Sequence, residues 1–539
     1  MKLAYHAAAD LSDRLLHDRV VEKIWQRDPG AWAAAPGSAD ARSIETRLGW
    51  LDVGKTMSAK LKQVHHLRDE VKAERFERAY LLGMGGSSLC AEVMSSVFGV
   101  AEGFPQLTVL DTTDELTLTT AANRLDPART LFIVASKSGS TVEVASMERF
   151  FWDRMTGAVG ADAGRHFIAI TDPETSLQKL AERRGYREVF INPGDIGGRF
   201  SALSLFGLVP AAVIGAPVDT LLSAGAAMAE GCRQHNHANA GLELGAFMGA
   251  AGLDGRDKLT VALAPSFATL GLWIEQLVAE STGKHGKGLL PVVDEPLGRP
   301  DEYGADRAFV SIASESDAAD EERMAALEAA GFPVLRLSIR HDGIGAEFFR
   351  WEFATAIAGA ALVINPFDEP NVSEAKEKTK ALLSSFAANG RFDDTPPSAS
   401  AESVRHAIAS LRAGDYAAFL SYLPGESDVE EALGEIRTEL RSRTKVASTF
   451  GLGPRYLHST GQYHKGGPNT CVAFVLTTDD ATSTPIPDAG YSFSVLKRAQ
   501  ALGDVQTLEA HGRRVARLHF RSADMAAAEL KRIFTEALS

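Results

Sequence analysis

The chain has 539 residues, of which 45% are hydrophobic and 23% charged, a composition typical of a globular protein with about two to four domains. Its net charge of −14 argues against a nucleic-acid partner, because binding to phosphate backbones requires a basic face. Three widely spaced cysteines, Cys90, Cys232 and Cys471, indicate reduced thiols in a cytoplasmic protein, and no metal-ligand spacing is present. The N-terminus lacks a signal-like apolar core, and the apolar run at 205–218 is too short to span a membrane, so no membrane association is expected.

Residues 1–76 are predicted to form an N-terminal helical segment without strands. From residue 77 to 235, short apolar runs alternate with helical stretches: AYLLGMG, LTVLDTT, TLFIVAS, HFIAITD and EVFINPG. Strands separated by helices in this way are typical of βαβ units with a parallel sheet. This range is therefore predicted to be the first α/β domain.

A second alternating region, 236–388, contains the strand candidates KLTVALAPS, AFVSIAS and PVLRLSIR. The polar segment 389–403 carries two prolines and is predicted to be a linker or loop. Residues 404–539 contain helices and the strand candidates TCVAFVLTT and RVARLHF, and form either a third α/β unit or the completion of the second. The predicted fold class is α/β, with two tandem domains built on doubly wound parallel sheets and a C-terminal α/β segment.

The motif at 136–141, SKSGST, follows one of these strands and precedes a helix. The free amides and the dipole of a helix N-terminus favour an anion, and the hydroxyl groups add hydrogen-bond donors. A simple helix cap would also explain one serine, but four hydroxyl residues with a glycine and a lysine indicate a phosphate cradle. The spacing of a P-loop is absent.

Three further motifs are candidates for a site. The turn at 83–88, GMGGSS, suits a phosphate, a nucleotide or only tight helix packing, and Asp111 makes a poor match to the acidic residue of a dinucleotide site. In the motif at 197–201, GGRFS, Gly198 allows close backbone approach and Arg199 offers a permanent cation. Glu280 lies near the end of an apolar helix, where burial would raise its pKa toward that of a general base, although on the pattern alone an ordinary exposed helix-end glutamate is the simpler interpretation.

Taken together, these motifs resemble the phosphoglucose isomerase family, whose members contain two sugar-isomerase (SIS) domains. SKSGST, GGS, GGRFS and ESTGK at 280–284 have counterparts in that family, and NPFDEPNVSEAK at 365–376 is similar to its FDQxGVExxxK segment. The resemblance is clear from residue 80 to residue 376. It is closest to the isomerase half of bacterial transaldolase–isomerase fusions, without the transaldolase portion.

The resemblance implies a role for each matching residue. It assigns Glu280 as the base, Arg199 as the group that stabilises the enediolate, and Lys376 as a ring-opening residue. The implied ligands of the substrate are Gly86, Ser87, Ser136, Lys137, Ser138, Ser140, Thr141, Gly198 and Gln276. It also implies that the protein uses no cofactor, binds a sugar phosphate and forms a homodimer.

The sequence departs from the family pattern at several positions. Glu369 and Asn371 replace the usual glutamine and glycine, and Leu205 stands where a small residue is usual. The family's ring-opening histidine normally lies between the glutamate and lysine motifs, but here a similar motif, LHSTGQ with His458, follows the lysine. We expect that the order of segments has changed while the site survives. His464 and Lys465 are weaker candidates.

The expected reaction is isomerisation of glucose 6-phosphate and fructose 6-phosphate through a cis-enediolate, with Glu280 carrying the proton and Arg199 stabilising the developing charge. Two alternatives remain at this point: a dual phosphoglucose/phosphomannose isomerase, and a non-catalytic sugar-phosphate-binding SIS protein. A nucleotide-dependent enzyme using the turn at 83–88 is a weaker third.

Overall fold

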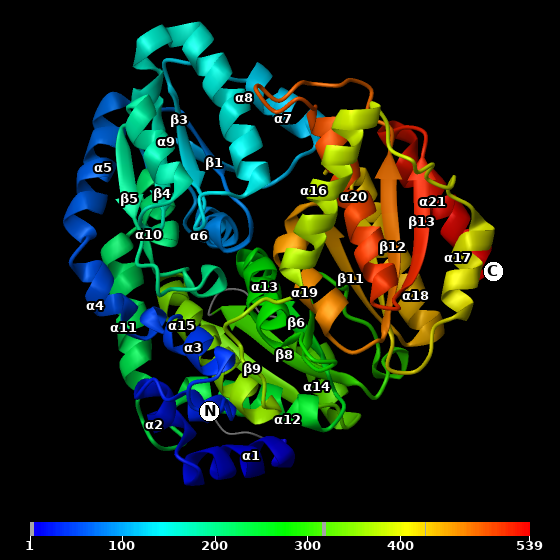
Figure 1. Cartoon of the computed structure of the whole chain (residues 1–539). Coiled ribbons are helices and arrows are strands. Elements are labelled where there is room, and N and C mark those ends of the chain that lie inside the picture. Colours follow the sequence, from blue (N-terminus) through cyan, green and yellow to red (C-terminus); the bar gives the residue numbers. More distant parts are fainter. Residues whose placement is uncertain (1–4, 315–319, 426) are drawn as a thin grey trace.

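The computed structural model describes residues 5–314, 320–425 and 427–539, and it contains three separate parallel β-sheets (Figure 1). The first sheet has the strand order β2-β1-β3-β4-β5. Its strands are β1 (Arg78–Leu82), β2 (Gln106–Leu110), β3 (Thr130–Ala135), β4 (Phe167–Thr171) and β5 (Glu188–Ile191). All five predicted strands of this region are confirmed, and all are parallel.

Helices cover both faces of the first sheet, which explains why its inner strands β1, β3 and β4 are nearly continuous buried runs, while the edge strands β2 and β5 are partly exposed. Every residue of β3 is buried, and alternate residues such as Ile133 and Phe132 enter two different hydrophobic cores. One face packs against α5 (Leu61–Glu74), α6 (Leu89–Phe98) and α10 (Leu205–Val213). The other packs against α7 (Glu115–Asn123), α8 (Val142–Val159) and α9 (Ser176–Arg184).

The second sheet has the order β7-β6-β8-β9, again all parallel. Its strands are β6 (Lys258–Leu263), β7 (Leu290–Val292), β8 (Arg307–Ser314) and β9 (Val334–Ile339), of which β7 was not predicted. Residues of this sheet share one continuous core with the first sheet. The helices of this region are α11 (Val218–Gly231), α12 (Ala240–Leu253), α13 (Leu270–Thr282), α14 (Glu321–Ala329) and α15 (Ile344–Leu362).

The C-terminal region has its own sheet, with the order β11-β10-β12-β13, so it does not complete the second one. Its strands are β10 (Tyr416–Ser421), β11 (Ala447–Leu452), β12 (Cys471–Thr478) and β13 (Arg514–Phe520), of which β10 and β11 were not predicted. The surrounding helices are α16 (Val372–Asn389), α17 (Ala401–Ala409), α18 (Ser427–Thr444), α19 (Gly461–Gly466), α20 (Phe493–Ala510) and α21 (Ala523–Leu538). Figure 1 shows α16 and α20 side by side, facing the first sheet.

The third sheet packs against the second through β7 and α13. Leu290 and Val292 of β7 and Ala279 of α13 share a core with Ala418 of β10 and Ala447 of β11. The last turns of α13 are therefore enclosed by all three parts of the molecule, because α6 of the first part also contacts this helix. This packing determines where Glu280 lies.

The N-terminal segment contributes α1 (His6–His17), α2 (Val20–Trp25), α3 (Ala39–Glu45) and α4 (Val53–Ser58), and no strand precedes β1 in the described part of it. Residues 1–4 of the predicted segment lie outside the described residues. The domain boundaries expected from the sequence stay predictions. All three cysteines are buried and free. In the described part of the chain, no helix is long and apolar enough to cross a membrane.

Candidate active site

Glu280 lies in the last turn of α13, and its carboxylate faces Arg199. Glu280 Oε1 is 3.2 Å from Arg199 Nη1, and Gln276 Nε2, one turn earlier on the helix, donates a hydrogen bond to Glu280 Oε2 at 3.0 Å. Only 8% of Glu280 is exposed. Burial raises the pKa of this carboxyl group, while Arg199 lowers it and the nearby Glu369 raises it further; the net direction is upward.

Arg199 is held by every nitrogen of its guanidinium group. Nε donates to Ser281 Oγ at 2.8 Å, and Nη2 donates to the carbonyl oxygens of Pro366 (2.8 Å) and Asp368 (2.9 Å). Nη1 is shared between Glu280 and Glu369, whose Oε2 lies 3.1 Å away. The guanidinium group of Arg199 is thus fixed in one orientation, as electrostatic stabilisation of an anion requires.

Glu369 connects this cluster to the N-terminal segment. Arg47 Nη1 pairs with Glu369 Oε2 at 2.7 Å and donates to the carbonyl oxygen of Phe367, also at 2.7 Å. Although burial raises the pKa of Glu369, the two arginines outweigh it and lower the pKa to about 2. Glu369 is therefore an anion between two cations, Arg47 and Arg199. At this position of the sequence the family usually has a neutral glutamine.

The glycine turn after β1 packs directly against these residues. A Cβ atom on Gly86 would overlap the carbonyl oxygen of Gly198, and a Cβ on Gly85 would lie 2.8 Å from Gln276 Nε2 and 2.7 Å from the carbonyl oxygen of His458. Gly85 also has a positive φ of 56°. Ser87 is buried in the same turn. The turn at 83–88 is thus glycine-rich because three other segments approach its backbone.

His458 follows β11 and joins the site through both its backbone and its ring. Its carbonyl oxygen accepts a hydrogen bond from Gln276 Nε2 at 2.8 Å, and its ring Nε2 lies 2.9 Å from Glu143 Oε1. Gln500 of α20 donates to the same Glu143 oxygen at 2.7 Å. Burial raises the pKa of Glu143, but the adjacent His458 reverses the effect, so the pKa is lowered.

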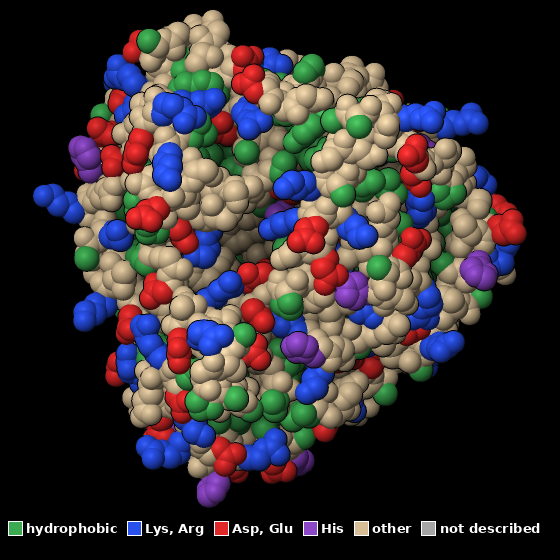
Figure 2. Space-filling view, in the orientation of Figure 1, with side chains coloured by type: hydrophobic (Ala, Val, Ile, Leu, Met, Phe, Trp, Pro, Cys, Tyr) green, Lys and Arg blue, Asp and Glu red, His purple; other side chains and the backbone are tan. Residues whose placement is uncertain are grey.

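A cavity of about 500 Å³ opens beside His458. On one side it is lined by Ser138, Ser140, Thr141 and Glu143 at the N-terminus of α8, and on the other by Lys376 of α16. A helix N-terminus with hydroxyl groups opposite a lysine suits a phosphate group. Figure 2 shows a hollow near the centre of this face, between the first sheet and α16, with charged side chains around it.

Two residues of the predicted phosphate cradle, Ser136 and Lys137, do not line this cavity. The ammonium group of Lys137 pairs with Asp172 and donates to the carbonyl oxygen of Gly194 at 3.0 Å, and Lys137 is not among the residues that line the cavity. Ser136 Oγ is 3.1 Å from Thr141 Oγ1 but lines a neighbouring pocket. The structure therefore brings Ser138, Ser140 and Thr141 to the cavity, and not the side chain of Lys137.

The two weaker candidates, His464 and Lys465, lie on α19 beside the third sheet and do not line the cavity. His464 is fully buried beside Tyr416, and burial lowers its pKa to about 3. Lys465 pairs with Asp504 at 2.6 Å in the interior. Sequence reasoning missed Glu143 and Arg47. For Glu143 a signal existed, since it lies two residues after the phosphate motif; for Arg47 the sequence offers none.

Comparison of the amino-acid sequence with known proteins shows the family of the chain. Residues 65–289 match the family model described as phosphoglucose isomerase. A glucose-6-phosphate isomerase from Lactobacillus helveticus is 30% identical over 304 residues, which cover 48% of this chain and 68% of the relative. The chain belongs to the phosphoglucose isomerase family. A second relative in this family, glucose-6-phosphate isomerase from Carboxydothermus hydrogenoformans, is 27% identical over 397 residues, covering 62% of this chain and 85% of the relative.

Solved structures show that the fold is also that of this family. A hypothetical protein from Thermus thermophilus superposes with a TM-score of 0.61 at 24% identity, covering 70% of this chain and 98% of the other. A glucose-6-phosphate isomerase from Chlamydia trachomatis superposes with a TM-score of 0.55 at 17% identity, covering 70% and 86%. The predicted α/β class with parallel sheets is thereby confirmed.

Proposed function

We propose that this protein is a glucose-6-phosphate isomerase that interconverts glucose 6-phosphate and fructose 6-phosphate through a cis-enediolate. The observation that carries the proposal is the pair formed by Glu280 and Arg199. A buried carboxylate with a raised pKa stands beside a fully fixed guanidinium group. Neither side chain lines the cavity that suits a phosphate, but Gln276 links Glu280 to the carbonyl oxygen of His458, which does line it. Family membership and the names of the relatives support the same reaction.

In this proposal Glu280 moves a proton between C1 and C2 of the open-chain sugar. The charge that develops on the oxygens is stabilised by Arg199, whose orientation is set before the substrate arrives. Gln276 donates a hydrogen bond to Oε2 of Glu280 and would contact the sugar. The base operates best when its pKa lies near the working pH, and burial moves Glu280 in that direction.

Ring opening is assigned to His458 and Lys376, which line the same cavity. Glu143 holds the His458 ring in place, so His458 can act as an acid or base at the hemiacetal. The phosphate is assigned to Ser138, Ser140 and Thr141 with the free amides of α8. Ser136, Lys137, Gly86, Ser87 and Gly198 remain proposed ligands by family resemblance, and the ammonium group of Lys137 would first have to leave Asp172.

The test is a coupled assay that follows glucose 6-phosphate formed from fructose 6-phosphate, with Glu280→Gln and the matched control Glu275→Gln. Glu275 is the preceding buried acid on α13, and burial raises its pKa to about 8. We expect Glu280→Gln to lose roughly 10²–10⁴-fold in kcat and Glu275→Gln to keep its activity. Full activity in Glu280→Gln, or no activity in the parent protein, would overturn the proposal.

Two further features are proposed by family resemblance: the protein is a homodimer, and it acts in the cytoplasm as a glycolytic and gluconeogenic enzyme. Light scattering after gel filtration tests the first. A mass of one chain, 57.6 kDa, at micromolar concentration would contradict it.

A further inference from the structure

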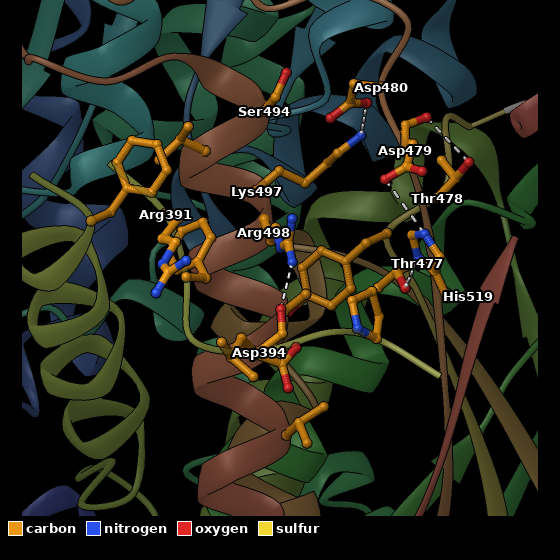
Figure 3. Close-up of a pocket in the computed structure, with 18 of the residues that line it drawn as sticks. Arg391, Asp394, Thr477, Thr478, Asp479, Asp480, Ser494, Lys497, Arg498 and His519 are labelled. Atoms are coloured by element: carbon orange, nitrogen blue, oxygen red, sulfur yellow. Dashed lines mark hydrogen bonds and ion pairs between the residues drawn. The ribbon is translucent and has the colours of Figure 1, made fainter. Parts of the chain in front are cut away.

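A second cavity of about 490 Å³ lies on the far side of α16 and α20 from the candidate active site. Among the described residues, none lines both cavities. The second cavity is enclosed by α20, the ends of β12 and β13, the last turns of α16 and the segment 390–396 (Figure 3). Its size is typical of a small-molecule site rather than a packing defect.

The position of this cavity in the third sheet is one where ligands bind in parallel folds. The strand order β11-β10-β12-β13 means that the chain moves to opposite sides of β10 after successive crossovers. Ligands bind at the carboxyl ends of strands next to such a reversal. Tyr422 directly follows β10, Thr477 and Thr478 end β12, and all three line the cavity.

The lining of the cavity changes from apolar in the middle to polar at its ends. Val475, Leu502 and Val505 are apolar, and Phe386 and Phe392 contribute two rings whose centroids are 5.0 Å apart. A planar ring fits against such a surface. Beyond it, one end is rich in hydrogen-bonding groups: Thr477, Thr478, Asp479, Asp480, Thr482 and Ser494.

The charges of the cavity are unequal between its two sides. Lys497 is paired with Asp114 at 2.9 Å and Asp480 at 2.5 Å, and Arg517 binds Asp394 through two hydrogen bonds. Arg391, in contrast, is 80% exposed, and its ion pair with Asp393 is long, at 3.8 Å. Figure 3 shows Arg391 on the opposite side of the cavity from Asp479 and Thr478. Of the aspartates that line the cavity, Asp479 is the exposed one, and its contact with His519 is long, at 3.5 Å. A ligand would therefore direct an anionic group to Arg391 and hydrogen-bond donors toward Asp479.

We propose that this cavity binds a nucleoside monophosphate. The base would lie against the apolar surface, its phosphate beside Arg391, and its hydroxyl or amino donors toward Asp479. A simple sugar phosphate offers the anion and the donors but no planar ring for Phe386 and Phe392, so the nucleotide is the better match.

Helix α20 connects this cavity to the candidate active site. Lys497, Arg498 and Ala501 line the second cavity, while Gln500 of the same helix lines the first and donates to Glu143, which holds His458. A nucleotide that shifts α20 would therefore move the carboxylate that orients His458. This coupling, unlike the binding itself, rests on the proposed isomerase function.

Calorimetry with adenosine monophosphate, in the absence and presence of saturating fructose 6-phosphate, tests the binding without reference to activity. We expect binding that persists in the sugar phosphate, because the two cavities share no lining residue among those described. Arg391→Glu should weaken it by about tenfold or more, while Arg521→Glu, an exposed arginine that does not line the cavity, should leave it unchanged. Adenosine and inorganic phosphate alone should each bind more weakly.

No heat of binding at millimolar nucleotide would overturn the site, as would complete displacement by fructose 6-phosphate or equal affinity in Arg391→Glu. For the coupling, we expect saturating nucleotide to change the isomerase kcat of the parent protein and not that of Arg391→Glu. Binding without any change in kcat would refute the coupling alone. An inactive parent protein that still binds the nucleotide would refute the isomerase proposal and leave the site standing.

Discussion

Replacing Glu369 with glutamine restores the residue that the family usually has and removes one of the two anions that share Arg199. Glu369 Oε2 and Glu280 Oε1 lie 3.1 Å and 3.2 Å from the same nitrogen, Arg199 Nη1. The charge of Glu369 raises the pKa of Glu280, and it also takes up part of the positive field of Arg199. We therefore expect Glu369→Gln to lower the pKa of the proposed catalytic base.

The size of the shift follows from the distances. Two oxygens bound to one nitrogen at these lengths are at most about 6 Å apart, where two unit charges interact by roughly 0.7 kcal/mol in water and roughly 2.8 kcal/mol at an effective dielectric constant of about 20. Since one pKa unit corresponds to about 1.4 kcal/mol, the pKa of Glu280 should fall by roughly 0.5–2 units. Burial of both groups favours the upper part of this range.

The assay is the pH dependence of kcat/KM, whose acid limb reports the base in the free enzyme. Glu369→Gln should move this limb to lower pH, while the control Glu374→Gln should not, because Glu374 bonds Asn371 and His511 instead of Arg199. An unchanged limb in Glu369→Gln, or one displaced to higher pH, would refute the electrostatic reasoning.

The substitution also has a cost in stability that does not distort this profile. The pKa of Glu369 is lowered to about 2, so its charge stabilises the fold fully above about pH 4.5 and this stabilisation is lost as the pH falls through 2. The displacement of about 2.5 units corresponds to roughly 3 kcal/mol as an upper value. Between pH 5 and 9 the loss in Glu369→Gln is therefore constant, and thermal denaturation across that range checks it.

Three further predictions concern single residues. Glu143→Gln removes the anion that holds the His458 ring and should lower kcat by roughly tenfold or more in both directions of the coupled assay, with an unchanged circular dichroism spectrum; unchanged kcat would contradict the role of Glu143. Lys137→Met should raise KM less than Lys376→Met does, because Lys137 is paired with Asp172, and the reverse order would return Lys137 to the phosphate site. Glu352 is fully buried and its pKa is raised well above normal, so the stability of the native protein falls as the pH rises above about 4.5. In urea denaturation at pH 8, Glu352→Gln should therefore be more stable than the parent by roughly 1 kcal/mol or more, and this difference should be smaller at pH 5.

The sequence was sufficient for all five strands of the first sheet, and it missed β7, β10 and β11, although every residue of β10 is buried. Each strand of the first sheet is an apolar run between recognisable turns, so its pattern is visible locally. Strand β7 has only three residues, and β11 (ASTFGL) contains serine, threonine and glycine and is only partly buried. Such segments are strands because a partner strand offers them hydrogen bonds, and that partner lies far away in sequence.

The candidate site shows the same limit. Motif spacing made Arg199, Glu280 and the turn at 136–141 candidates, because each lies at the end of a strand or helix where ligands collect. It could not identify pairs formed between distant segments, such as Arg47 with Glu369 or Glu143 with His458, which is 315 residues further along. Nor could it show that the ammonium group of Lys137 is held by Asp172, since an ion pair depends on where the next strand ends.

The position of His458 is the point at which topology matters more than order along the chain. In the family the ring-opening histidine precedes the lysine motif, whereas here His458 follows it, after a strand of the third sheet. That sheet packs on β7 and α13, which brings the end of β11 to the last turns of α13. There the His458 carbonyl oxygen meets Gln276 and the ring meets Glu143 at the start of α8. A catalytic group needs only the correct position in the folded protein. In the proposed site, the segment after β11 of the third sheet can therefore replace a segment that would otherwise come from the second sheet.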